Sequence, residues 1–158
     1  MKELDTKFNE MKKELGFNVT LDELDDVFFI RDFVQQAKFV SNKPSRAVCA
    51  RMIDTFQSWT PVLQNILMPN PGSLVTMTEG KPFEEEDKKN ASKLLCQIME
   101  MTRRHNLIGL TKDKKEEGKF IDEAYKFWNE TSSKQLVPIL KKLNETWKKE
   151  AKEGFETV

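Results

Sequence analysis

Hydrophobic residues recur along most of this chain at intervals of three or four positions, the period of an α-helix with one buried side. The first such stripe consists of Leu4, Phe8, Met11 and Leu15. Gly16 follows directly, and glycine is common just after a helix end because it adopts the left-handed conformation without strain. The pattern predicts a helix that ends near residue 15.

A second helix is predicted from Thr20 to about Val40. Thr20 and Glu23 have the spacing of a capping box, in which each side chain accepts a hydrogen bond from the other residue's backbone N–H. The apolar side of this segment changes between its two halves. The first half carries Leu21, Leu24, Val27 and Phe28, and the second carries Phe29, Phe33, Val34, Ala37 and Val40. Because such a helix touches neighbours on two sides, we expect it near the centre of the fold.

Proline marks the start of the next two predicted helices. Pro44 fits the first turn of a helix, and Thr60–Pro61 fits the N-cap and first position of a short one. The two buried stripes are Val48, Cys49, Met52, Phe56 and Trp59, then Val62, Leu63, Ile66 and Leu67. Residues 69–82 contain prolines and glycines, and Leu74–Met77 has strand character without a partner strand. We therefore expect one long loop there.

Three more helices are predicted in the second half of the chain. Acids at 84–87 and bases at 103–105 suit the two ends of a helix dipole. Capping signals at 113–116 and 132–135 begin the other two helices. Their stripes are Phe120, Ile121, Ala124, Phe127 and Trp128, then Leu136, Leu140, Leu143, Trp147 and Ala151. Gly118 lies inside the first of these two helices and destabilises it by about 1 kcal/mol relative to alanine. Pro138 lies several residues into the second, so that helix starts after residue 133 or kinks at the proline.

These segments predict an all-α fold, a compact bundle of six or seven helices with one long loop near residues 69–82. The length of 158 residues is typical of one domain, so we expect residues 1–158 to form a single domain with the last few residues frayed. Eleven phenylalanines and three tryptophans supply enough apolar surface for a packed core, which argues against a disordered chain.

The sequence offers no catalytic or metal-binding motif. His105 is the only histidine, and it falls at the end of a predicted helix, where it is expected to be partly buried or bonded to the last carbonyls. Cys49 and Cys96 do not form a Cys-x-x-Cys pair, so we expect two reduced, buried thiols. Acid clusters such as Asp22 with Asp26 lie at helix starts, where the dipole explains them. We predict no cofactor, no metal and no enzymatic activity.

Charge limits the partners further. Lysine plus arginine and aspartate plus glutamate number 26 each, so no overall field attracts nucleic acid or an anionic membrane. The N-terminus mixes acids with bases and lacks the apolar core of a signal peptide. The chain also lacks a run of about 18 apolar residues, which a membrane span requires. We expect a cytoplasmic protein outside the membrane.

The first candidate binding region is the charge-poor middle of the chain. Residues 52–78 contain one charged residue, Asp54, where a chain that is 33% charged would average about nine. Two interpretations are open: a packed core with the loop lying over it, or an apolar surface that accepts a partner helix or another copy of the chain. The predicted protein-binding residues are Phe56, Trp59, Leu63, Met68, Leu74 and Met77.

The second candidate is a lysine-rich face on the last helix, formed by Lys134, Lys141, Lys142, Lys148, Lys149 and Lys152. Such a row is either a solvated surface or a contact with nucleic-acid backbone. Aromatic residues that would stack on bases are missing from it. We favour a non-enzymatic protein-interaction module, an adaptor, regulator or assembly subunit, with a nucleoprotein subunit as the alternative.

Overall fold

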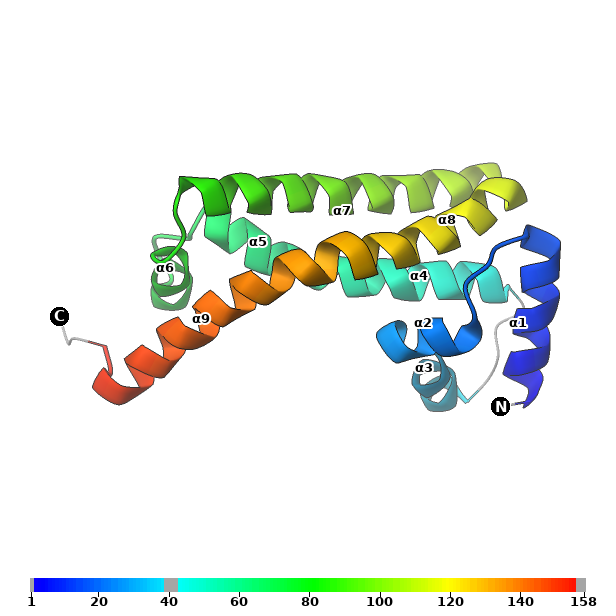
Figure 1. Ribbon diagram of the computed structural model, residues 1–158, viewed down its shortest axis with the longest axis horizontal. Coiled ribbons are helices and arrows are strands. Elements are labelled where there is room, and N and C mark those ends of the chain that lie inside the picture. The colour runs from blue at the N-terminus through cyan, green and yellow to red at the C-terminus, as the bar shows by residue number, and fades with distance from the viewer. Residues whose placement is uncertain (1, 39–42, 156–158) are drawn as a thin grey trace.

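The computed structural model describes residues 2–38 and 43–155, and these ranges contain helices and no strand (Figure 1). The first helices are α1 (Lys2–Leu15), α2 (Leu21–Phe28), α3 (Ile30–Ala37), α4 (Pro44–Gln57) and α5 (Thr60–Leu67). They are followed by α6 (Leu74–Gly80), α7 (Glu85–Thr111), α8 (Lys114–Phe127), the π-helical turn η1 (Trp128–Ser132) and α9 (Ser133–Glu153). Within the described ranges, every helix is too short or too polar to span a bilayer.

At two junctions one helix follows another with no loop of several residues between them. Phe29 adopts the left-handed conformation (φ 55°) and ends α2 while preceding α3. α8 continues through η1 into α9 without a turn. With the helices joined at each of these junctions counted once, the described part of the chain holds seven helical units, which confirms the predicted all-α bundle of six or seven helices.

α4 occupies the centre of the molecule. It packs against α1, α2, α5, α7 and α8, while α5 continues beyond it beneath the long rod of α7 (Figure 1). Phe56 on α4 is fully buried, stacks on Trp128 at 5.9 Å between ring centroids and meets Phe28 edge-on at 6.0 Å. Such aromatic pairs contribute about 0.5–1.5 kcal/mol each beyond their buried area. The expectation that the 20–40 segment is central was therefore wrong.

Local signals located most helix starts correctly. Thr20 and Glu23 form the predicted capping box, with the Glu23 N–H donating to the Thr20 hydroxyl at 3.1 Å. Ser132 is an exception, because it lies buried inside η1 and makes no cap bond. The predicted end of the second helix, Val40, lies outside the described residues, and α3 ends at Ala37. α7 runs to Thr111, beyond the predicted end near residue 105.

The predicted long loop was wrong for residues 74–80, which form α6. Ser73 is the N-cap of this helix, and its hydroxyl accepts a hydrogen bond from the Thr76 N–H at 3.2 Å. Gly80 allows α6 to lie against the end of α5, since a Cβ there would be 2.6 Å from Cγ of Pro69. Burial of Thr78 and packing on α5 and α9 outweigh the weak helix propensity of Val75 and Thr76.

Gly118 sets the distance between α1 and α8. A Cβ at this position would lie 2.3 Å from the carbonyl oxygen of Leu15, the last residue of α1. Both atoms belong to helix backbone or are fixed to it, so rotation of a side chain cannot relieve the clash. The packing of α1 on α8 therefore requires a residue without a side chain, which explains a glycine inside a helix.

Gly118→Ala should lower the free energy of unfolding by about 2 kcal/mol, because the overpacking cost exceeds the gain of about 1 kcal/mol in helix propensity. Urea unfolding followed by circular dichroism measures this change. Asn90→Ala, at an exposed position of α7, is the matched control and should be neutral or slightly stabilising. A Gly118→Ala protein as stable as the native one would contradict the close approach.

Candidate functional site

The structure divides the predicted protein-binding residues into two groups. Phe56 and Leu63 are completely buried and belong to the core, and Trp59 is half-buried against it. Met68, Leu74 and Met77 are exposed, with 83% of Met68 and 60% of Leu74 accessible. Val75, which the predicted set omitted, is also exposed. We call Met68, Leu74, Val75 and Met77 the α6 face.

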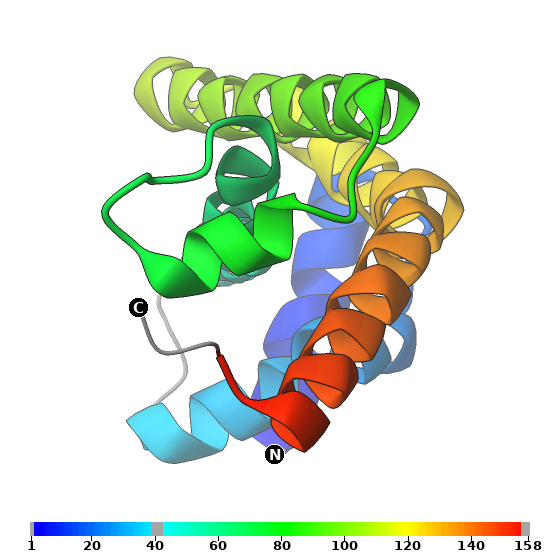
Figure 2. The ribbon, with the colours of Figure 1, turned by 90° about the vertical axis from the view of Figure 1, so that its left-hand side faces the viewer.

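Neighbouring contacts hold α6 with this face outward. Thr78 and Gly80 of α6 are buried, and α6 packs against α5 and α9. The indole N–H of Trp147 on α9 donates to Glu79 Oε2 at 2.8 Å. Figure 2 looks onto this end of the molecule, with α6 in front and the C-terminal half of α9 beside it. Leu74, Val75 and Met77 therefore lie on an anchored helix, and Met68 lies at the end of α5, which packs on it.

Five of the six lysines predicted to contact nucleic acid are exposed on α9: Lys134, Lys141, Lys148, Lys149 and Lys152. Lys142 differs, because its ammonium pairs with Asp87 and lies 5.6 Å from the ring centroid of Phe83. The hydrogen bond from Lys142, together with the one from the Glu84 N–H, lowers the pKa of Asp87. Lys142 thus fastens α9 to the start of α7.

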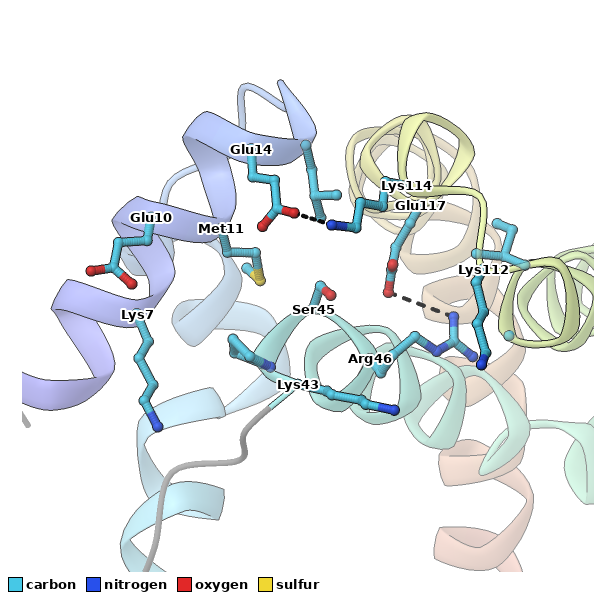
Figure 3. A pocket seen from close by; sticks show the side chains of 14 residues that line it. Lys7, Glu10, Met11, Glu14, Lys43, Ser45, Arg46, Lys112, Lys114 and Glu117 are labelled. Carbon is cyan, nitrogen blue, oxygen red and sulfur yellow. Dashed lines mark hydrogen bonds and ion pairs between the residues drawn. The ribbon is translucent and has the colours of Figure 1, made fainter.

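A polar pocket of about 570 Å³ lies at the other end of the molecule, between α1, the start of α4, the end of α7 and the start of α8 (Figure 3). Its charged lining comprises five cations, Lys7, Lys43, Arg46, Lys112 and Lys114, and three acids, Glu10, Glu14 and Glu117. The lining therefore carries a net charge of +2 in a chain whose net charge is zero. None of the residues predicted to bind a partner lies in this pocket.

Arg46 and Glu117 form the buried wall of this pocket. Arg46 Nη1 lies 3.7 Å from Glu117 Oε1, and neither of these two buried atoms has a hydrogen-bond partner. Arg46 Nη2 donates to the carbonyl of His105 at 3.3 Å. Gly109 admits the guanidinium, since a Cβ there would be 2.7 Å from Nη2. The arginine is thus held against α7 while its charge faces a carboxylate from α8.

The environment of His105 favours the neutral imidazole. Burial lowers the pKa of His105, the charge of Arg46 lowers it further, and Asp54 acts in the opposite direction. Arg46 Nη2 also lies 3.4 Å from His105 Nε2. Because a guanidinium only donates, Nε2 is the acceptor and Nδ1 carries the proton. His105 faces one cation rather than a pair of converging carboxylates, so it lacks the partners of a general base.

The two cysteines have different surroundings. Cys49 is buried as expected, and burial is the main cause that raises the pKa of its thiol, with Glu117 acting in the same direction. A thiol that resists ionisation is a poor nucleophile. Cys96 is exposed on α7, so the expectation that both thiols are buried was wrong for this residue. Neither cysteine is in a disulfide.

The sequence contained partial signals for the pocket. Glu117 directly follows the capping signal at 113–116, but it occupies the fourth position of α8 and is buried. Gly109 and Gly118, both inside helices, mark the two close approaches that border the pocket. A glycine that interrupts a helical pattern often has a packing or functional reason. The residue that packs against such a glycine, however, is distant in the sequence, and only the fold identifies it.

His105 should titrate with a pKa below its ordinary value of 6.5. Folding then favours the neutral ring, so the corresponding stability is complete above pH 6.5 and decreases as the pH falls through the lower, folded-state pKa. Because His105 is the only histidine, its Cε1 proton gives an unambiguous resonance for NMR titration. Asp54→Asn should lower the pKa further, and a pKa at or above 6.5 in the native protein would contradict the described environment.

Comparisons with other proteins give no independent indication of function. No family model matches the chain, and neither a curated protein nor a solved structure matches it. Proposals about this protein therefore depend on its own residues and their geometry.

Proposed function

We propose that this protein is a non-enzymatic, cytoplasmic protein-interaction module that binds an amphipathic helix of a partner through the α6 face. The observation that supports the proposal is the exposure of four large apolar side chains, Met68, Leu74, Val75 and Met77, within ten residues of an anchored segment. Leu74 and Met77, three positions apart, share one side of α6, and neighbouring exposed apolar side chains are typical of interaction sites. Two methionines give the surface adaptable side chains.

The surroundings of the α6 face favour a partner helix with acidic flanks. The stretch from 52 to 78 has one charge, so the face itself offers no ion pairs. Exposed Lys148 follows Trp147, which bonds α6 through Glu79, so this lysine belongs to the part of α9 that packs on α6. Lysines beside an apolar face attract a helix that presents leucine-like residues centrally and carboxylates at its edges.

Leu74→Gln combined with Val75→Gln should weaken binding of such a helix at least tenfold, because two apolar side chains no longer pack against the partner. The probe is a fluorescein-labelled synthetic peptide with a leucine stripe flanked by glutamates, measured by fluorescence anisotropy. A second peptide with lysines in place of the glutamates should bind more weakly.

Leu107→Gln combined with Leu110→Gln is the matched control, since both leucines are exposed on α7, outside the α6 face. This control should bind the acidic peptide like the native protein. Both double variants should retain native stability within about 0.5 kcal/mol, as expected for surface changes. Equal binding by all three proteins would reject the α6 face as the contact surface.

A second candidate function is binding of nucleic-acid backbone through α9. It is favoured by four exposed lysines on one stripe of the helix: Lys134, Lys141, Lys148 and Lys152. Their replacement by glutamine should reduce the salt dependence of binding to duplex DNA, and the slope should fall by about 0.9 for each phosphate that the variant no longer neutralises.

Filter binding at two salt concentrations measures that slope. The matched control replaces four exposed lysines elsewhere with glutamine: Lys89, Lys93, Lys115 and Lys126. If the native protein shows no salt-sensitive binding at low ionic strength, or if both quadruple variants behave alike, this second function is excluded.

A further inference from the structure

We propose that the pocket between α1, α4, α7 and α8 binds a small phosphorylated sugar or polyol. This site lies at the opposite end of the molecule from the α6 face, so the proposal is independent of the proposed function (Figure 1). The phosphate is placed at the first turn of α4, and a hydroxyl group of the ligand is placed at Glu117.

The first turn of α4 offers backbone donors to an anion. Lys43 is the N-cap and makes no side-chain cap bond, and Pro44 at the first position has no N–H. The first bond within the helix joins the Ala47 N–H to the Lys43 carbonyl, so the N–H groups of Ser45 and Arg46 remain outside the helical ladder. N–H groups at a helix start, together with the positive end of the dipole, bind phosphate well.

Cations around this turn strengthen the preference for an anion. Lys112 ends α7 in the left-handed conformation (φ 56°), and its side chain extends toward Arg46 and Lys43 at the mouth of the pocket (Figure 3). Lys114 is balanced by Glu14, with which it forms an ion pair. Lys7 is paired with Glu3 at 3.3 Å, so Lys112 is the cation that brings uncompensated charge to the start of α4 among the described residues (Figure 3).

Glu117 supplies the second, independent observation. It is 94% buried, it lines the pocket, and its Oε1 accepts no hydrogen bond. The distance of 3.7 Å to Arg46 Nη1 permits attraction but is too long for a hydrogen bond. A buried acceptor without a donor costs free energy that a ligand hydroxyl would recover. In Figure 3 the Glu117 carboxylate and the Ser45 hydroxyl face the same space.

These two features together define the class of ligand. A phosphate group alone would satisfy the α4 donors but leave the carboxylate without a donor, and a neutral sugar would do the reverse. A phosphorylated sugar or polyol carries both groups. The volume of about 570 Å³ falls in the range of sites that hold a whole small molecule.

The test uses three probes on the full chain: glucose 6-phosphate, inorganic phosphate and glucose. ¹⁵N NMR titration should show the Ser45 and Arg46 amides shifting with glucose 6-phosphate, shifting with inorganic phosphate at higher concentration, and remaining in place with glucose. Calorimetry supplies the dissociation constants. Failure of glucose 6-phosphate to shift these amides, or a tighter response to glucose, overturns the proposal.

Two variants separate binding from folding. Ser45→Glu places an acid in the first turn of α4, which favours the helix but repels phosphate, so affinity for both phosphates should fall by at least tenfold without loss of thermal stability. Lys112→Asn removes a cation while asparagine tolerates the positive φ, and it should weaken binding by about tenfold. Lys115→Gln, at an exposed residue outside the pocket, should bind like the native protein.

Glu117→Gln tests the hydroxyl contact. Removal of a negative charge should retain or raise affinity for inorganic phosphate, while the advantage of glucose 6-phosphate over phosphate should shrink by about tenfold. Circular dichroism tests whether Glu117→Gln leaves the fold intact. If this variant does not fold, the Ser45→Glu variant decides whether the pocket binds phosphate. The proposed ligand class is refuted if Ser45→Glu and Lys112→Asn leave the affinities unchanged. It is also refuted if the native protein binds glucose 6-phosphate and inorganic phosphate equally well.

Discussion

The close approach of helix backbones at two glycines is the constraint on which the arrangement of this molecule depends. Gly118 brings α8 against the carbonyl of Leu15, and Gly109 admits the guanidinium of Arg46 against α7. α8 continues through η1 into α9, so the position of its first turns also directs the last helix toward α6. A larger side chain at Gly118 would displace α1 from α8, and the pocket between them would change with it.

The Arg46–Glu117 pair is better explained by a binding role than by stability. Burying a charge costs several kcal/mol unless good geometry and hydrogen bonds offset it, and here that cost falls on Glu117, whose side chain is 8% exposed against 29% for Arg46. Here the closest atoms are 3.7 Å apart and lack hydrogen-bond partners. Apolar residues of similar volume would hold α4 to α8 at lower cost. The pair therefore supports the proposed ligand site rather than an account based on core packing.

Local sequence signals were enough for most of the fold. Apolar stripes at helical spacing and the Thr20–Glu23 capping box depend on interactions within a few residues, and they located α1, the start of α2, α4 and α8. The errors arose where tertiary packing decides. Phe29 breaks a continuous helical pattern in a conformation that phenylalanine disfavours, and α6 depends on its burial against α5 and α9.

The candidate sites were less predictable than the fold for the same reason. Charge depletion identified the segment that contains the α6 face, but periodicity could not separate buried Phe56 and Leu63 from exposed Leu74. The pocket joins Arg46 to Glu117 across 71 positions of sequence, and only the packing of α4 on α8 brings them together. Gly118 was visible as an interruption of a helical pattern, without an indication of what approached it, and Gly109 lay beyond the predicted end of its helix.

The net charge of zero conceals two ends with different electrostatics. α7 spans about 40 Å at 1.5 Å per residue, and it separates a charge-poor apolar end at α6 from a pocket lined by an excess of cations. The two sites share no residue, so occupancy of one does not obstruct the other. Linkage between them would require a ligand to favour one of two arrangements of the shared helices. α4 is the element through which such linkage would have to pass, because its first turn lines the pocket and its far end packs on α5, which leads into α6.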